Sequence, residues 1–111
     1  MKDIKKGCYR GIGFLSANAL YPNALEKTIE GYLVKRVKAL GGQALKWVSP
    51  GMSGVPDRIV FLPGGRIILV EVKAPGKKLR PLQLYVKEQL EALGVDFRVV
   101  DSKEAVNALF F

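Results

Sequence analysis

Asp57 and Glu71 are the only acidic residues between Gly31 and Lys87, and both adjoin strongly apolar runs. Charged carboxylates are rarely found in such surroundings unless a cation or another partner pairs with them. Two carboxylates that lie close together repel each other, and a cation between them removes the repulsion. Mg²⁺ is commonly bound by one or two carboxylates with water, and it promotes attack of water on phosphate. The pair therefore predicts metal-assisted hydrolysis of a phosphate ester.

Lys73 follows Glu71 by two residues, so the two side chains share one face of a strand. In that position Lys73 can orient a nucleophile or neutralise the charge that develops on a phosphate. The alternatives are a solvated Glu–Lys pair at a strand end and a turn residue at Asp57 after Pro56, because both are common. The three residues together favour the catalytic interpretation.

Hydrophobic periodicity and turn signals predict the elements that position these residues. The expected order is a helix over 25–40, strands over 44–48, 57–62 and 66–73, a helix over 81–93, a strand over 95–100, and a short helix capped by Ser102. The turn Pro63-Gly64-Gly65 makes a hairpin of the second and third strands, with Asp57 and Glu71 at its open end. Antiparallel pairing then brings the two carboxylates together in an αβββαβ fold.

The first helix offers a third carboxylate. Its apolar face is formed by Ile29, Leu33, Val37 and Leu40. Glu26 and Glu30 lie one turn apart within this apolar arc, so either of them can complete a metal site. The alternative for Glu26 is a helix-start carboxylate that the helix dipole favours.

The start of the second helix carries cations where the helix dipole disfavours them. These cations are Lys77, Lys78 and Arg80, which we call the basic loop. Exposed helix amides and basic side chains suit a phosphate backbone, although a solvated loop is the alternative. Gln83, in the first turn, can point either at the site or at water.

Composition sets limits on the function. The 111 residues are 49% hydrophobic and 25% charged, as expected for one globular domain, and the formal net charge is +8. This charge suggests nucleic acid as a partner first and an anionic membrane second, although a basic protein without such a partner is also possible. The absence of histidine excludes Ser-His-Asp triads and nearly all zinc sites.

Further features concern location and assembly. With Cys8 alone, no intrachain disulfide can form, which fits a reducing cytosol. The longest uncharged run, 11–25, contains polar residues and a proline, so we expect no membrane span and disfavour a secretion signal. Apolar side chains near both ends suggest a homodimer interface, unless the ends fold back on their own core. They are Phe14, Leu15, Leu20, Tyr21, Leu109, Phe110 and Phe111.

These motifs together resemble the PD-(D/E)xK nuclease superfamily, and within it the small stand-alone VRR-NUC domains of bacteriophages and bacteria. The resemblance covers Leu25 to about Ser102, through LEKTIEGYLVKRVKALGG, SGVPDRIVFLPGG and VEVKAPGKKLRPLQ. A lone ExK motif is weakly specific, but GVPD, a Pro-Gly-Gly turn, EVKAPG and PxQ in this order are quite specific. The first twenty or so residues have no counterpart, so we expect an N-terminal arm over 1–24 and a nuclease domain over 25–111.

The resemblance implies a restriction-endonuclease-like core, a central mixed sheet flanked by helices, and Mg²⁺ or Mn²⁺ as the cofactor. By matching motifs, Asp57, Glu71 and the backbone carbonyl of Val72 hold the metal, and Lys73 is the catalytic lysine. The glutamine of the following helix matches Gln83.

The helix-one glutamate of the family matches Glu26 better than Glu30, because Ile29 and Leu33 then occupy the family's apolar positions. Glu30 has a similar pattern with Leu33 and Val37, so it stays as the alternative metal ligand one turn away.

The leading functional hypothesis is a structure-selective DNA endonuclease, similar to Holliday-junction resolvases and flap nucleases. It would act as a homodimer on branched DNA in the cytoplasm of a bacterium or an infected host cell. The alternatives are a sequence-indifferent nickase or exonuclease, and a nucleic-acid-binding module that has lost catalysis.

Overall fold

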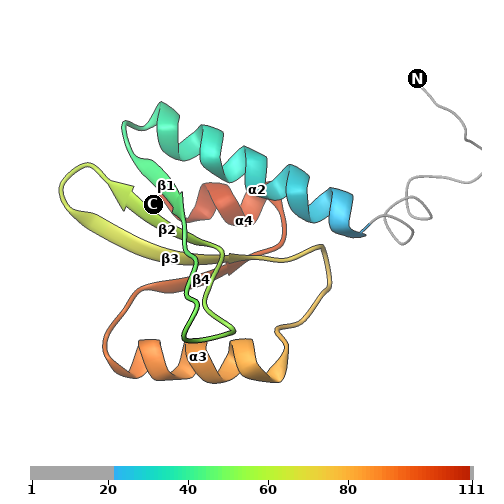
Figure 1. The fold of residues 1–111 in the computed structure, drawn as a ribbon. Coiled ribbons are helices and arrows are strands. Elements are labelled where there is room, and N and C mark those ends of the chain that lie inside the picture. The colour runs from blue at the N-terminus through green and yellow to red at the C-terminus, as the bar shows by residue number, and fades with distance from the viewer. Residues whose placement is uncertain (1–21, 111) are drawn as a thin grey trace, which may run out of the picture.

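A computed structural model describes residues 22–110, which form a four-stranded sheet with helices on both faces (Figure 1). The elements are α2 (Pro22–Ala39), β1 (Gln43–Lys46), β2 (Arg58–Leu62), β3 (Arg66–Val72), α3 (Pro81–Ala92), β4 (Phe97–Val100) and α4 (Lys103–Ala108). Every predicted element is present, with boundaries that differ from the prediction by three residues or fewer. No helix among these residues combines the length and hydropathy that a membrane crossing requires.

The sheet has the order β1-β2-β3-β4 and is mixed. The first three strands pair antiparallel, β1 with β2 through the loop 47–57 and β2 with β3 through the tight turn 63–65, whereas β4 pairs parallel with β3. A parallel pair needs a crossover connection, and α3 supplies it on the face opposite α2 and α4 (Figure 1). This arrangement confirms the predicted αβββαβ fold with a central mixed sheet.

The core lies between the sheet and the α2–α4 layer. Its buried residues are Ile29, Leu33, Val37, Val60, Ile68, Val70, Val72, Val100, Val106 and Leu109. Leu40 was expected in this core, but it is 42% exposed, so that prediction is wrong. The helix ends at Ala39 because Gly41 adopts a φ of 86°, which turns the chain toward β1 before Leu40 can reach the core.

The C-terminal helix folds back onto the domain. Ser102 caps α4 by accepting a hydrogen bond from the backbone N–H of Ala105 at 3.0 Å, as predicted. Leu109 is only 2% exposed and Phe110 packs against the same core, so neither forms a free apolar surface. The argument for a dimer interface from these two residues is therefore wrong. The rest of that apolar set lies outside the described residues.

Candidate active site

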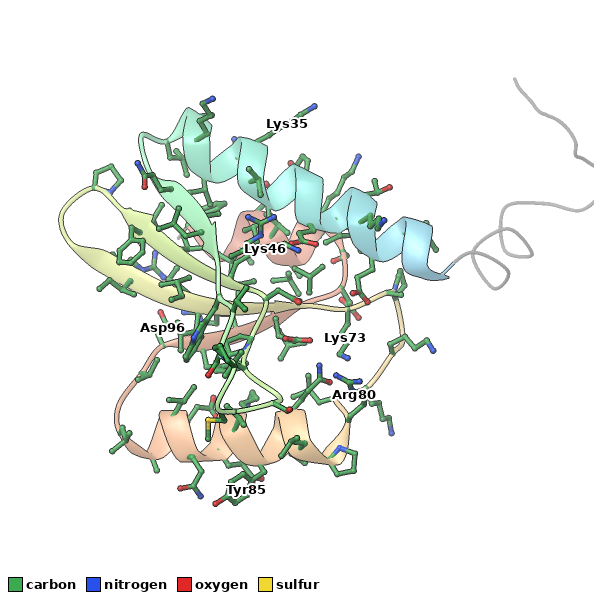
Figure 2. All side chains as sticks on the ribbon, in the orientation of Figure 1. Lys35, Lys46, Lys73, Arg80, Tyr85 and Asp96 are labelled. Atoms are coloured by element: carbon green, nitrogen blue, oxygen red, sulfur yellow. The ribbon has the colours of Figure 1, made fainter. Side chains whose placement is uncertain are left out.

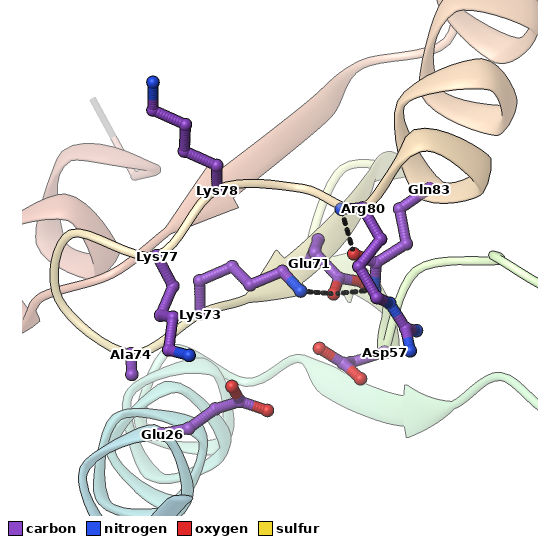
Figure 3. A pocket seen from close by; sticks show the side chains of 9 residues that line it. All are labelled: Glu26, Asp57, Glu71, Lys73, Ala74, Lys77, Lys78, Arg80 and Gln83. Carbon is purple, nitrogen blue, oxygen red and sulfur yellow. Dashed lines mark hydrogen bonds and ion pairs between the residues drawn. The ribbon is translucent and has the colours of Figure 1, made fainter. Parts of the chain in front are cut away.

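The open end of the β2–β3 hairpin brings Asp57 and Glu71 together. Arg58 pairs with Val70 in the antiparallel register, which places the two acids at the next position (Figure 3). The backbone N–H of Val72 donates to Oδ2 of Asp57 at 2.8 Å, so the Asp57 carboxylate is fixed to the end of β3. The hairpin thus holds both carboxylates at one end of the two inner strands of the sheet.

Glu71 is an ionisable group buried near the end of β3, with only 3% of the residue exposed. Burial, followed by repulsion from Asp57, raises the pKa of Glu71 from 4.5 to about 7. Lys73 opposes this shift, because its Nζ lies 3.7 Å from Oε2 of Glu71. Without a cation beyond Lys73, the carboxylate therefore keeps its proton to a higher pH than an exposed glutamate does.

Gln83 connects α3 to Glu71. Its Nε2 donates to Oε2 of Glu71 at 2.9 Å, while its Oε1 accepts from the backbone N–H of Arg80 at 2.9 Å. The two contacts fix the amide orientation, because one requires a donor and the other an acceptor. Gln83 is 7% exposed and points into the site, so of the two orientations left open by the sequence, the structure has the inward one.

Asp57 is half-buried, and its burial raises its pKa. The hydrogen bond from the Val72 amide opposes the shift, and the negative charge of Glu30 adds to it. The loop before Asp57 lies against α3, where a Cβ on Gly54 would come within 2.9 Å of the backbone oxygen of Leu82. The glycine of the GVPD motif therefore allows the chain to approach α3 before it enters the site.

A cavity of about 420 Å³ opens over the two carboxylates. It is lined by Glu26, Asp57, Glu71, Lys73, Ala74, Lys77, Lys78, Arg80 and Gln83 (Figure 3). All predicted side-chain positions except the alternative Glu30 line this cavity. Ala74 was not singled out from the sequence; it is 2% exposed and occupies the cavity wall directly after Lys73.

The structure distinguishes the two helix-one glutamates by their partners. Glu26 lines the cavity and contributes repulsion that raises the pKa of Glu71. Glu30 instead accepts a hydrogen bond from Nε of Arg58 at 2.8 Å, in a half-buried ion pair outside the cavity lining. Sequence reasoning missed Arg58 as this partner, although its position directly after Asp57 is a usable signal. The contacts favour Glu26 as the member of the site.

The basic loop forms one wall of the cavity. Lys77 directs its amine toward the carboxylates, whereas Lys78 extends away from them (Figure 3). Arg80 precedes the first residue of α3 and lies beside Lys73 on the same side of the fold (Figure 2). Cations here oppose the helix dipole, which is consistent with a surface that binds anions.

The donor chemistry fits a hard divalent cation. The acidic side chains that line the cavity are those of Glu26, Asp57 and Glu71, and oxygen ligands of this kind suit Mg²⁺. A cation would favour the charged forms of Asp57 and Glu71, whose pKa values are both raised. Within residues 22–110, however, no three acidic or thiol side chains form a single compact metal-binding group. Two carboxylates and a backbone carbonyl are enough for Mg²⁺, which keeps several waters.

The fold and the cavity define a mixed α/β protein with a carboxylate–lysine site at the ends of two inner strands, as in the PD-(D/E)xK nucleases. The profile of the VRR-NUC domain matches residues 11–104, so the chain belongs to the VRR-NUC domain family. It is 51% identical over 84 residues to p44, a proposed nuclease of Acyrthosiphon pisum secondary endosymbiont phage 1. That alignment covers 76% of this chain and 90% of p44.

A solved structure of a VRR-NUC domain superposes with a TM-score of 0.73 at 37% identity, covering 78% of this chain and 94% of that one. Sequence, fold and family therefore agree that this chain is a nuclease.

Proposed function

We propose that this nuclease is a divalent-metal-dependent endonuclease that acts on DNA and prefers branched substrates. One observation carries the proposal: Glu71 is buried beside Asp57, with Lys73 within 3.7 Å of it. Burying two acids together raises the free energy of the fold, and replacing them with apolar residues would avoid this cost. A catalytic metal site accounts for their presence.

In the proposed reaction, Asp57, Glu71 and the Val72 carbonyl would hold the metal, and Glu26 would contribute from α2. When bound, a divalent cation supplies Lewis acidity and neutralises charge on the phosphate. The hydrogen bond from Gln83 fixes the carboxylate plane of Glu71, and the Val72 amide fixes that of Asp57.

Lys73 holds a positive charge at the cavity floor, where its amine can stabilise the negative charge that develops on the phosphate. The basic loop contacts the phosphates on either side of the scissile bond and so holds the strand in place. These contacts read no base sequence, which fits an enzyme that selects the shape of its substrate.

We propose a homodimer, because cutting two strands symmetrically at a junction calls for two sites related by a two-fold axis. Leu109 and Phe110 do not support the dimer, because both pack against the core of their own domain. The sheet supplies another exposed apolar group on the α3 side, where Leu45, Phe61 and Ile67 are 48%, 39% and 50% exposed. A monomeric mass by light scattering at micromolar protein would contradict this assembly.

The substrate preference is tested by incubating the protein with duplex, flap, cruciform and single-stranded DNA in Mg²⁺ or Mn²⁺. We expect cleavage of flap or cruciform DNA first, and none in chelator. Equal cleavage of all substrates would support the nickase or exonuclease alternative. Binding in chelator without cleavage in either metal would instead support a non-catalytic binding module.

The division into an arm over 1–24 and a nuclease domain over 25–111 stays a prediction, as does a cytoplasmic location. Helix α2 begins at Pro22, three residues before the expected domain start. Removing residues 1–21 and measuring thermal stability and cleavage would test whether the domain is self-sufficient.

A further inference from the structure

A second groove lies on the surface where α2 meets α4. It has a volume of about 230 Å³ and is lined by Lys27, Thr28, Gly31, Tyr32, Lys35 and Lys103. Three of these six residues are cations, and Tyr32 is the aromatic member. Grooves that hold single-stranded nucleic acid combine the same two features, a positive charge along the backbone and an aromatic ring.

Contacts within the protein hold Tyr32 in a fixed position. The Tyr32 hydroxyl donates to Oδ1 of Asn107 at 3.0 Å, and Nε of Arg36 donates to the same oxygen at 3.0 Å. Nζ of Lys103 lies 5.3 Å from the centre of the Tyr32 ring, within cation–π range. The ring and the lysine are thus pre-organised on the surface, and little side-chain freedom remains to be lost on binding.

The lysines of the groove have no acidic partner among residues 22–110. The ion pairs in that part of the chain involve neither Lys27, Lys35 nor Lys103. Glu30, one turn from Lys27, is already paired with Arg58. Lys35 extends away from the sheet into solvent (Figure 2). Among the described residues, no carboxylate therefore neutralises the charge of the groove.

Gly31 has no structural role that the fold explains. It is an exposed residue in the middle of α2, where glycine is less favourable than alanine. A Cβ placed on Gly31 would meet nothing within 4 Å, so no packing contact requires the missing side chain. The absence of a side chain leaves the groove floor open, which allows a ligand to approach the helix backbone closely.

From this combination we infer that the α2–α4 groove is a second nucleic-acid site, which holds the phosphodiester backbone of a DNA strand beyond the catalytic cavity. Both pockets are lined from the first half of α2, the cavity by Glu26 and the groove by Lys27. From Lys27 to Lys35 the helix rises about 12 Å, a length along which a strand presents more than one phosphate. The inference rests on the proposed branched DNA substrate, and the groove would hold a strand from one arm of that DNA.

The test measures DNA binding in chelator, which removes the metal that the proposed cleavage needs. The groove variant is Lys35→Gln with Lys103→Gln, which leaves every residue of the catalytic cavity unchanged. A control of equal charge change is Arg66→Gln with Lys87→Gln, two cations outside both pockets. The probe is a fluorescent single-stranded DNA long enough to span both pockets, titrated at several salt concentrations.

We expect the groove variant to lower the slope of log affinity against log salt by about 1.4, or about 0.7 for each lost phosphate contact. The control should leave the slope unchanged. With Mg²⁺, the groove variant should raise KM and keep kcat. Equal slopes for the two variants would overturn the inference. A wild-type protein that binds DNA but never cuts it would count against the proposed nuclease reaction and not against the groove.

Gly31→Gln gives a second, uncharged test. A glutamine there should not lower the melting temperature, because the position is open and glutamine favours helix more than glycine. The same side chain fills the groove floor, so DNA should bind several-fold more weakly. Wild-type affinity in a stably folded Gly31→Gln protein would contradict the groove as a binding site.

Discussion

Replacing Glu71 with glutamine should stabilise the metal-free protein above neutral pH, although it removes a proposed catalytic group. The reason is the raised pKa of Glu71, which burial and then Asp57 cause. Between pH 4.5 and about 7 the folded protein binds more protons at this site than the unfolded chain does. The free energy of unfolding therefore falls as pH rises through this range.

The size of the effect follows from the pKa. A rise from 4.5 to about 7 corresponds to about 3 kcal/mol of stability, which is present below pH 4.5 and lost above about pH 7. A glutamine of the same shape can still accept the hydrogen bond from Gln83. It leaves Lys73 without its ion-pair partner, which reduces the stabilisation of the folded protein. We expect a net stabilisation of about 1–3 kcal/mol at pH 8 and little difference at pH 4.

The assay is urea unfolding in chelator, followed by the fluorescence of Trp47, the single tryptophan of the chain. Wild type and Glu71→Gln are compared from pH 4 to pH 8. Glu88→Gln serves as the control, because it makes the same chemical change at an exposed position of α3. Adding Mg²⁺ at pH 8 should stabilise the wild type more than Glu71→Gln, since metal binding favours the charged carboxylate.

Two results would refute this reasoning. One is a Glu71→Gln protein that is no more stable than wild type at pH 8 in chelator. The other is a pair of stability curves that run parallel between pH 5 and pH 8. Either result would mean that the Glu71 carboxylate is solvated well enough to stay charged, and the strain we assign to the site would be absent.

Three other predictions concern the cavity. Glu26→Gln should lower the cleavage rate by about tenfold or more, whereas Glu30→Gln, one turn away, should mainly lower the melting temperature because Arg58 loses its partner. A larger loss of rate in Glu30→Gln than in Glu26→Gln would identify Glu30 as the metal ligand instead. Lys73→Ala should keep most metal affinity and lose about 10²–10³-fold in kcat. A Lys73→Ala protein that cleaves at the wild-type rate throughout a metal titration would count against this role. Changing all three cations of the basic loop to alanine should weaken binding to every DNA sequence alike and lower the salt slope by about two to three, while an unchanged slope would assign them to solvent.

Local sequence signals were enough to predict the order of the elements and the β2–β3 hairpin, whereas the mixed sheet was expected from the family resemblance. Turn residues and alternating apolar positions specified the hairpin, and its register placed Asp57 opposite Glu71. Longer-range packing was harder to predict, as Leu40 and Leu109 illustrate. Leu40 fits the helical period but lies past the end of α2, and Leu109 fits no periodic pattern but is buried where α4 meets α2. Both outcomes depend on where the chain turns in space, which periodicity does not specify.

The site shows the same division between local and distant information. A spacing of two residues placed Glu71 and Lys73 on one face, as the strand period requires. It could not choose between Glu26 and Glu30, because residues one turn apart fit the same helix face equally well. The choice depends on Arg58, a partner 28 positions along the chain from Glu30. The α2–α4 groove was not predicted either, because Lys103 reaches it only through tertiary packing.

The most direct measurement of the central claim is cleavage of a cruciform DNA by wild type and Asp57→Asn, each titrated with Mg²⁺ from a chelated start. Asparagine keeps the side-chain shape and can still accept from the Val72 amide, but it removes one negative charge beside Glu71. We predict that wild-type cleavage rises with Mg²⁺ to a plateau, and that Asp57→Asn stays at least about 10²-fold slower at every concentration. Cleavage by wild type in chelator, or an Asp57→Asn rate equal to wild type, would contradict a metal-dependent site built on Asp57 and Glu71.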